Sequence, residues 1–181
     1  MKIRHSHKSD RFGIEQIHKT AFGKVEGPVI AGLVNDLFDD KTAEPRLSLV
    51  AIRNQKIAGH ILFTKANIRQ SPISVSASIL APLAVHPEAQ ATGVGSLLIK
   101  EGLSRLKKNG VDLVFVLGHP DYYPRSGFTP AGKLGFKAPY PIPEENAGAW
   151  MVIELSSGTI GKAKGIVECS DVLNQPEHWR E

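Results

Sequence analysis

The chain from residue 85 to residue 96 reads Val-His-Pro-Glu-Ala-Gln-Ala-Thr-Gly-Val-Gly-Ser. It joins an apolar segment to a helix-forming one and contains the spacing Gln90-x-x-Gly93-x-Gly95. Such a turn presents backbone N–H groups at the positive end of a helix, and its glycines let a phosphate approach without a Cβ in the way. No Gly-Lys-Ser/Thr follows, and the Gly-x-Gly-x-x-Gly fingerprint is missing, which excludes a P-loop and a dinucleotide site. The turn therefore predicts phosphate binding, with an ordinary tight turn before a helix as the alternative.

The segments that flank this turn have the pattern strand-helix-strand. Residues 74–85 alternate apolar with small or polar residues before an apolar end. Residues 93–109 carry an apolar stripe at helical spacing, and Asn109-Gly110 ends this predicted helix. Residues 113–117, Leu-Val-Phe-Val-Leu, are continuously apolar, which is typical of a strand buried on both faces.

The remaining segments complete a mixed sheet. Asp10 is a candidate N-cap for a first amphipathic helix, and a second follows after a break over residues 23–28, with Pro28 in its first turn. Strands are expected at residues 2–5, 47–52, 57–68 and 150–155. Helices, antiparallel hairpins and a strand-helix-strand unit in this order predict the fold class α/β, of the mixed α+β kind, and not a doubly wound sheet.

Composition and length limit the possible classes of protein. The chain has 181 residues and a formal charge of +4, which predicts one domain at 1–181 with a core at about 3–155 and a C-terminal extension at 156–181. Its lysines and arginines are scattered, which argues against a nucleic-acid-binding face. Neither a signal peptide nor an apolar stretch approaching the ~20 residues of a membrane span is found. A cytoplasmic monomer or homodimer that binds neither nucleic acid nor membrane is expected.

Two motifs at a suitable separation resemble the GNAT superfamily of N-acetyltransferases. The turn at 90–95 is similar to the family's coenzyme A motif, Gln/Arg-x-x-Gly-x-Gly/Ala, and residues 80–87 are similar to the strand before it. Residues 122–128, Tyr-Tyr-Pro-Arg-Ser-Gly-Phe, resemble the aromatic and Gly-Phe signature that ends the cofactor half. Residues 59–63 and 140–143 look like a subgroup of small bacterial members. The resemblance implies a mostly antiparallel mixed sheet of about seven strands with splayed central parallel strands, flanked by about four helices.

The resemblance also implies roles for individual residues. Leu83, Ala84 and Val85 would lie along the pantetheine arm of acetyl-coenzyme A, with Leu83 and Val85 offering backbone hydrogen bonds. The pyrophosphate would be held by the turn residues Gln90, Ala91, Thr92, Gly93, Val94, Gly95 and Ser96. Tyr123 stands four residues before Gly127, where the family commonly has the tyrosine that protonates the departing thiolate. The alternative is a tyrosine that only anchors a loop.

The acceptor side departs from the family pattern. Residues 118–121, Gly-His-Pro-Asp, make a short connection where many members have an asparagine and a longer helix. The subgroup usually has an acidic residue at His119 and an aromatic one at Ser126. Candidates for contact with the acceptor are Glu26, His60 and His119, although Glu26 is also compatible with a surface charge and His60 with a hydrogen-bonded structural histidine. No metal site is predicted, because the histidines have no suitably spaced partners.

The predicted activity is the transfer of an acetyl or other short acyl group from coenzyme A to an amine of a small molecule or peptide. An amine with a pKa of ~10.4 is neutral in only about one molecule in 2,500 at pH 7, so a base matters, and the sequence does not identify it. Cys169 is single and near the C-terminus, which makes it a poor nucleophile and favours direct attack in a ternary complex. The alternatives are a non-catalytic acyl-coenzyme A-binding regulatory module, transfer to an alcohol, and a longer acyl donor.

Overall fold

The computed structural model describes residues 1–180. In chain order its strands and α-helices are β1 (Lys2–His5), α1 (Arg11–Asp39), β2 (Leu47–Arg53), β3 (Lys56–Arg69), β4 (Ala77–Val85), α2 (Val94–Lys108), β5 (Leu113–Leu117), β6 (Thr129–Pro130), β7 (Phe136–Lys137), β8 (Trp150–Glu154) and β9 (Gly165–Glu168). Short 3-10 helices connect them: η1 (Lys8–Asp10), η2 (Lys41–Ala43), η3 (Pro87–Ala89), η4 (Tyr123–Ser126), η5 (Gly132–Leu134), η6 (Glu144–Ala149) and η7 (Pro176–Trp179).

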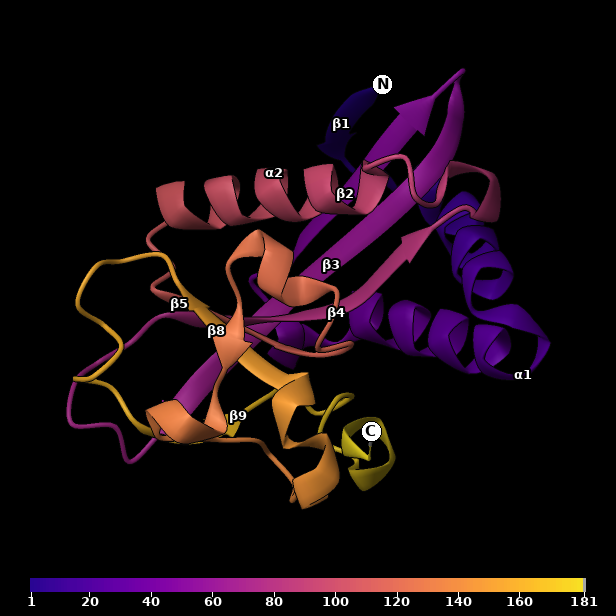
Figure 1. The fold of residues 1–181 in the computed structure, drawn as a ribbon. Coiled ribbons are helices and arrows are strands. Elements are labelled where there is room, and N and C mark those ends of the chain that lie inside the picture. Colours follow the sequence, from indigo (N-terminus) through magenta and orange to yellow (C-terminus); the bar gives the residue numbers. More distant parts are fainter. Residues whose placement is uncertain (181) are drawn as a thin grey trace.

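The strands form a mixed sheet in the order β1-β2-β3-β4-β5-β8-β6, and β9 pairs with β3 and β7 outside this path (Figure 1). The pairs β4–β5 and β7–β9 are parallel, and the other named pairs are antiparallel. The parallel pair β4–β5 is joined through α2, because parallel neighbours need a crossover connection. The predicted mixed α/β class is confirmed.

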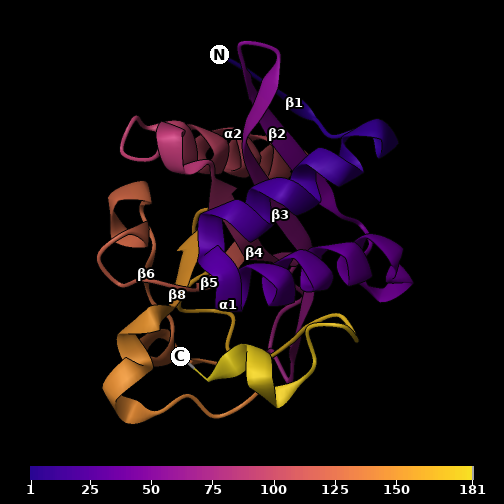
Figure 2. The same cartoon turned by 90° about the vertical axis from the view of Figure 1, so that its right-hand side faces the viewer.

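The two α-helices cover opposite faces of the sheet, as the views in Figures 1 and 2 show. Alternation along β3 explains this arrangement, because successive side chains point to opposite faces. Phe63 belongs to the core cluster that includes Leu98 of α2, whereas its neighbour Leu62 belongs to the cluster that includes Leu37 of α1. The four side chains are each fully buried.

Helix α1 consists of two helical halves, residues 11–22 and 24–39, which meet at a kink. Gly23 sits at the kink with a φ of +82°, which a glycine adopts without a steric penalty. The halves pack closely, since a Cβ on Gly27 would overlap the backbone carbonyl of Lys19. The predicted break over residues 23–28 is therefore limited to Gly23, and Pro28 lies inside the second half.

The parallel strands β4 and β5 pair over only part of their length. Their register runs from Ala77 opposite Leu113 to Leu80 opposite Val116, whereas β4 continues to Val85. On its other side, the end of β4 stays paired with β3, where the His86 N–H donates to the Ala58 carbonyl at 2.8 Å. Alternate residues direct their backbone groups to opposite sides. Leu83 and Val85 therefore direct theirs away from β3, toward the side where pairing with β5 has ended.

The structure has more strands and fewer α-helices than the sequence predicted. The sheet has nine strands among residues 1–180 and not about seven, because β6 and β7 are two-residue strands with no readable period and β9 lies in the C-terminal extension. The same residues form two α-helices and not about four, because the other helical segments are 3-10 turns. Neither α-helix is long and apolar enough to cross a membrane.

The C-terminal extension completes the core on the α1 face of the sheet. Trp179 is 3% exposed, its ring meets that of Trp150 edge-on at 5.6 Å, and its indole N–H donates to the Leu173 carbonyl at 2.8 Å. The hydroxyl of Thr42 accepts a hydrogen bond from the Asp171 N–H at 2.8 Å, which ties the extension to η2, directly after α1. Residues 156–180 thus pack as part of the fold.

Candidate active site

The turn between β4 and α2 is closed by its own side chains. Gln90 donates from Nε2 to the Val85 carbonyl at 3.1 Å, and the Thr92 hydroxyl donates to the Ala89 carbonyl. The positive φ of Ala91 (+60°) and of Gly93 (+89°) turns the backbone into the helix. The glutamine of the predicted motif therefore has a local function, which is to hold the end of β4 against the start of α2.

Gly93 stands at the N-cap of α2 with open space around it. An added Cβ would meet no atom within 4 Å, so protein packing does not require a glycine there. The left-handed φ does require one for a strain-free turn. The space lies where the first N–H groups of the helix are unpaired and the helix dipole is positive, which suits a phosphate group.

Gly95 is small for a different reason. A Cβ at this position would overlap the hydroxyl of Tyr122, and Val85 Cγ2 would lie 3.5 Å from it. Tyr122 also hydrogen-bonds the side chain of Ser96, and burial raises the pKa of the tyrosine hydroxyl. The guanidinium of Arg125 lies 4.9 Å from the centre of the Tyr122 ring. The sequence indicated phosphate access for Gly95 and no individual role for Tyr122, because only the fold brings the two residues together.

Tyr123 begins η4 and is 9% exposed. Its ring contacts those of Tyr122 and Phe128 edge-on, at 5.1 and 5.7 Å between centres. The same ring fills the space where a Cβ of Gly118 would lie, directly after the last residue of β5. The ring is therefore fixed at the C-terminal end of β5 by packing on several sides.

These contacts bring three segments together at one place. The end of β4, the start of α2 and the end of β5 are joined through the adjacent rings of Tyr122 and Tyr123. This is the side of β4 on which its pairing with β5 has stopped. The place combines an unpaired strand edge, a helix N-terminus and phenol groups, which together can bind an extended, anionic ligand and move a proton.

His60 lies in the interior and contacts a second histidine. Its ring is 0% exposed and lies on the α1 face of β3, where Nδ1 is 2.8 Å from Nε2 of His18, which is also 0% exposed. His18 was not among the predicted site residues, because its only signal in the sequence was a histidine on the apolar side of a helix. Burial lowers the pKa of His18 to about 4 and that of His60 well below its usual value. Both rings are therefore neutral at physiological pH.

The buried histidines predict that the protein loses stability in mild acid. The unfolded chain binds protons near pH 6.5, whereas the folded chain keeps the His18 ring neutral down to about pH 4. The unfolded state therefore gains protons first, and His18 alone should lower the free energy of unfolding by roughly 3 kcal/mol between pH 7 and 4. Urea unfolding across this range measures it. His18→Phe should flatten the curve, and parallel curves for the two proteins would contradict the prediction.

The other two candidates for acceptor contact are exposed. Glu26 lies on α1, three residues after the kink, and its side chain is exposed to solvent. His119 follows β5, and its carbonyl accepts the backbone N–H of Tyr122 at 3.1 Å. The structure thus places His119 beside the tyrosines along the chain and leaves Glu26 on the surface. Across residues 1–180, no three His, Cys, Asp or Glu side chains gather to hold a metal ion.

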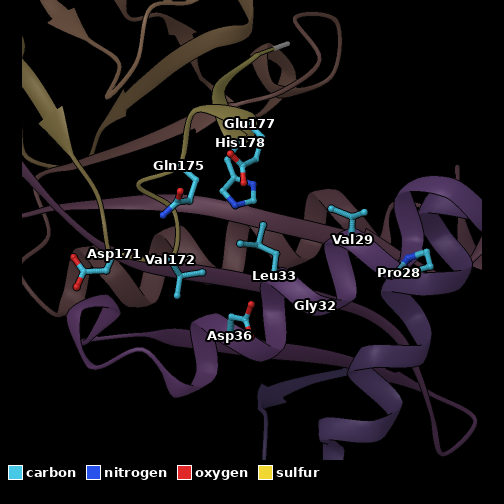
Figure 3. A pocket seen from close by; sticks show the side chains of 10 residues that line it. All are labelled: Pro28, Val29, Gly32, Leu33, Asp36, Asp171, Val172, Gln175, Glu177 and His178. Carbon is cyan, nitrogen blue, oxygen red and sulfur yellow. The ribbon is translucent and has the colours of Figure 1, made fainter.

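A groove separates the second half of α1 from the C-terminal extension. Its volume is about 550 Å³, and its walls combine apolar and acidic side chains (Figure 3). Leu33 and Val172 face one another across it, and Asp36, Asp171 and Glu177 stand at its edges. These residues are far apart in sequence, so no linear pattern indicated the groove.

Comparison with known proteins places this geometry in a family. Residues 2–131 match the acetyltransferase (GNAT) domain. The chain is 46% identical over 165 residues to the uncharacterized N-acetyltransferase YjhQ of Escherichia coli, covering 91% of this chain and 89% of the relative. The structure of YhbS from Escherichia coli in complex with coenzyme A superposes with a TM-score of 0.85 at 27% identity, covering 96% of this chain and 92% of that one. A Brucella melitensis GNAT acetyltransferase in complex with acetyl-coenzyme A gives a TM-score of 0.73 at 25% identity, with coverages of 95% and 97%. The chain belongs to the GNAT family of acetyltransferases.

Proposed function

We propose that this protein transfers an acetyl or other short acyl group from coenzyme A to an amine of a small molecule or peptide. The observation that carries the proposal is the meeting of an unpaired β4 edge, the open N-terminus of α2 and two tyrosines at one place. The relatives support it, since the YhbS and Brucella melitensis structures are complexes with coenzyme A and acetyl-coenzyme A.

The residues at this place fit an acyl-coenzyme A. The open space at Gly93 and the free helix end suit the pyrophosphate, which the backbone N–H groups of residues 90–96 would hold. Leu83, Ala84 and Val85 would lie along the pantetheine arm, whose amides can pair with a strand edge as an added strand does. Bound there, the thioester supplies an activated acyl group with a thiolate as the leaving group.

The chain's own part in the chemistry is to place the amine, accept its proton and protonate the thiolate. Tyr123 is our candidate for protonating the thiolate. Its ring is fixed at the end of β5, beside the part of β4 that is no longer paired with β5. A ring held by Gly118 and Phe128 keeps its hydroxyl in one position, which proton transfer in a transition state requires.

Direct attack of the amine is favoured over an acyl-enzyme. Cys169 follows β9 in the C-terminal extension, and burial raises the pKa of its thiol to about 12. A thiol needs to ionise to act as a nucleophile. At neutral pH this cysteine is therefore in its unreactive form.

Cys169→Ser should therefore retain most of the activity, with kcat changed by less than about 3-fold, since no step uses the thiol. Steady-state kinetics of the wild-type protein and the variant give the comparison. A folded variant without turnover, together with acyl label on Cys169 of the quenched wild-type protein, would instead establish an acyl-enzyme.

The experiment that tests the proposed function is a thiol-release screen. Acetyl-, propionyl- and longer acyl-coenzyme A are each paired with α-amines, ε-amines, polyamines and alcohols. We expect release that depends on an amine and is fastest with a short acyl donor. Binding of acyl-coenzyme A without release in the presence of any acceptor would favour a non-catalytic regulatory module.

A further inference from the structure

The groove between the second half of α1 and the C-terminal extension has the size of a site for a small molecule (Figure 3). Its volume of about 550 Å³ lies within the range of about 300–1,000 Å³ that is usual for small ligands. None of the ten residues that line it belongs to the turn at 90–96 or to η4. The groove is therefore a second candidate site, apart from the place assigned to the acyl donor.

The two walls of the groove are fixed to one another. The Val172 N–H donates to the Asp40 carboxylate at 3.0 Å, and the Asp171 N–H donates to the Thr42 hydroxyl at 2.8 Å. Farther along the extension, Trp179 is 3% exposed and anchors η7 in the core. A ligand that enters the groove therefore meets walls that are already in place, and binding does not have to order them.

The apolar part of the groove is aliphatic and contains unfilled space. Val29 and Leu33 line it from α1, and Val172 lines it from the extension. Gly32 lies on the same wall of α1, and a Cβ added there would meet no atom within 4 Å. A glycine inside a helix is destabilising relative to alanine, so the packing of the protein does not explain its presence. Room for a ligand in the groove explains it.

The charge of the groove is opposite in sign to that of the chain. Its edges carry Asp36, Asp171 and Glu177, and no Lys or Arg is among the ten residues that line it, whereas the whole chain has a formal charge of +4. Within residues 1–180 none of these three carboxylates is in an ion pair. By contrast Asp39, three residues after Asp36, is held by Arg11 at 2.9 Å. The groove therefore attracts a cation.

The cation that fits this groove is elongated and aliphatic. The ten lining residues include no Phe, Tyr or Trp ring, which the recognition of a quaternary ammonium group uses. Within residues 1–180 no three acidic, Cys or His side chains gather closely enough to hold a metal ion. Carboxylates spread along the edges of an aliphatic groove suit ammonium groups that are separated by methylenes. Gln175 and His178, which extend toward α1 in Figure 3, add hydrogen-bonding groups.

We propose that this groove binds an aliphatic polyamine of the size of spermidine. The methylene chain of the ligand lies along the aliphatic side chains, and its ammonium groups meet the three carboxylates at the edges. A small ligand is favoured over a folded protein partner, because a stable protein interface buries about 800 Å² on each side. The proposal goes beyond the proposed function and does not depend on it, since binding in the groove requires neither an acyl donor nor turnover.

The first test compares ligands that share only part of this chemistry. Isothermal titration calorimetry of the full-length protein at low salt uses spermidine, hexane-1,6-diamine, hexane-1,6-diol and magnesium chloride. We expect spermidine to bind most tightly, and the diamine to bind at least about 10-fold more tightly than Mg²⁺, which has the same charge but no methylenes to bury. The diol has the methylenes without the charge and should not bind measurably. Equal binding of Mg²⁺ and the diamine, or tighter binding of a tetralysine peptide than of spermidine, would overturn the proposal.

The second test fills the groove from the α1 wall. Gly32→Leu places a side chain in the open space and should weaken the binding of spermidine by about 10-fold or more, because the methylenes of the ligand lose their place. Gly132→Leu is the matched control, since an added Cβ at Gly132 also meets no atom within 4 Å and this glycine does not line the groove. The control should bind spermidine as the wild-type protein does. Wild-type affinity in a folded Gly32→Leu protein would contradict the proposal.

Charge variants keep the proposal testable even where Gly32→Leu does not fold, because the three carboxylates are exposed. Asp36→Asn should weaken the binding of spermidine by about 3-fold, as expected for one exposed ion pair. Its combination with Asp171→Asn and Glu177→Gln should weaken binding by about 30-fold. Glu145→Gln removes an exposed acid outside the groove and should have no effect. A loss in Glu145→Gln equal to that in Asp36→Asn would show attraction to the overall charge, without a site, and would overturn the proposal.

Discussion

Gly93→Val should weaken the binding of acetyl-coenzyme A by roughly 10- to 100-fold. Gly93 has a φ of +89°, which a β-branched residue adopts only with strain, and its Cβ would enter the open space at the end of α2. The valine would thus displace both the N–H groups and the phosphate that we propose they contact. Hydrogen bonds to a charged group are worth about 1.5–3 kcal/mol each, so losing one gives an effect of this size. Isothermal titration calorimetry measures the dissociation constant directly.

Gly110→Val is the matched control for this substitution. Gly110 has a φ of +83°, also has no atom within 4 Å of an added Cβ, and follows the other end of α2. Both variants should therefore lose similar stability, and only Gly93→Val should lose affinity. Wild-type affinity in Gly93→Val would remove the phosphate site from the start of α2, and equal losses of affinity in the two variants would show that strain alone is responsible.

Tyr123→Phe should lower kcat by roughly 10- to 100-fold with little change in the affinity for the acyl donor. The substitution keeps the ring that packs on Gly118 and Phe128 and deletes only the hydroxyl. The departing group is a thiolate whose acid has a thiol-like pKa of ~8.5, so a proton donor helps at neutral pH without being indispensable. The loss should therefore shrink with a donor whose thiol leaves more readily.

Tyr122→Phe separates the two adjacent tyrosines. The hydroxyl of Tyr122 lies at Gly95 and Ser96, at the start of α2, so its removal should change the binding of coenzyme A more than it changes kcat. Steady-state kinetics of both variants with one acceptor give the comparison. If Tyr123→Phe turns over normally while Tyr122→Phe loses kcat, the acid is Tyr122, and Tyr123 only fills space.

Much of the fold could be predicted because its central elements have strong local patterns. The apolar run at 113–117 coincides with β5, and the helix expected at 93–109 differs from α2 by one residue at each end. β9 was missed because its four residues, Gly165–Glu168, owe their strand structure to pairing with residues 67–69 of β3 and with β7. The pairing with β3 joins segments about a hundred residues apart, which no local period reports.

The same distinction between local pattern and long-range contact applies to the candidate site. The turn at 90–96 could be selected as a candidate phosphate site because its expected contacts come from a short stretch of backbone. The contacts of Gly95 with Tyr122 and of His18 with His60 could not be predicted, since each joins elements that only the folded sheet brings together. His60 was considered as a residue that meets the acceptor, and the structure instead places it in the core against His18.

The central claim is that this protein acylates an amine by direct transfer from coenzyme A, and mass spectrometry of a quenched reaction tests it most directly. The wild-type protein is mixed with acetyl-coenzyme A labelled in its acetyl group and with the acceptor that the thiol-release screen ranks first. We predict labelled N-acetylated amine, formed in step with released coenzyme A, and no label on the protein. Tight binding of acetyl-coenzyme A with no labelled amine in any mixture would contradict the claim.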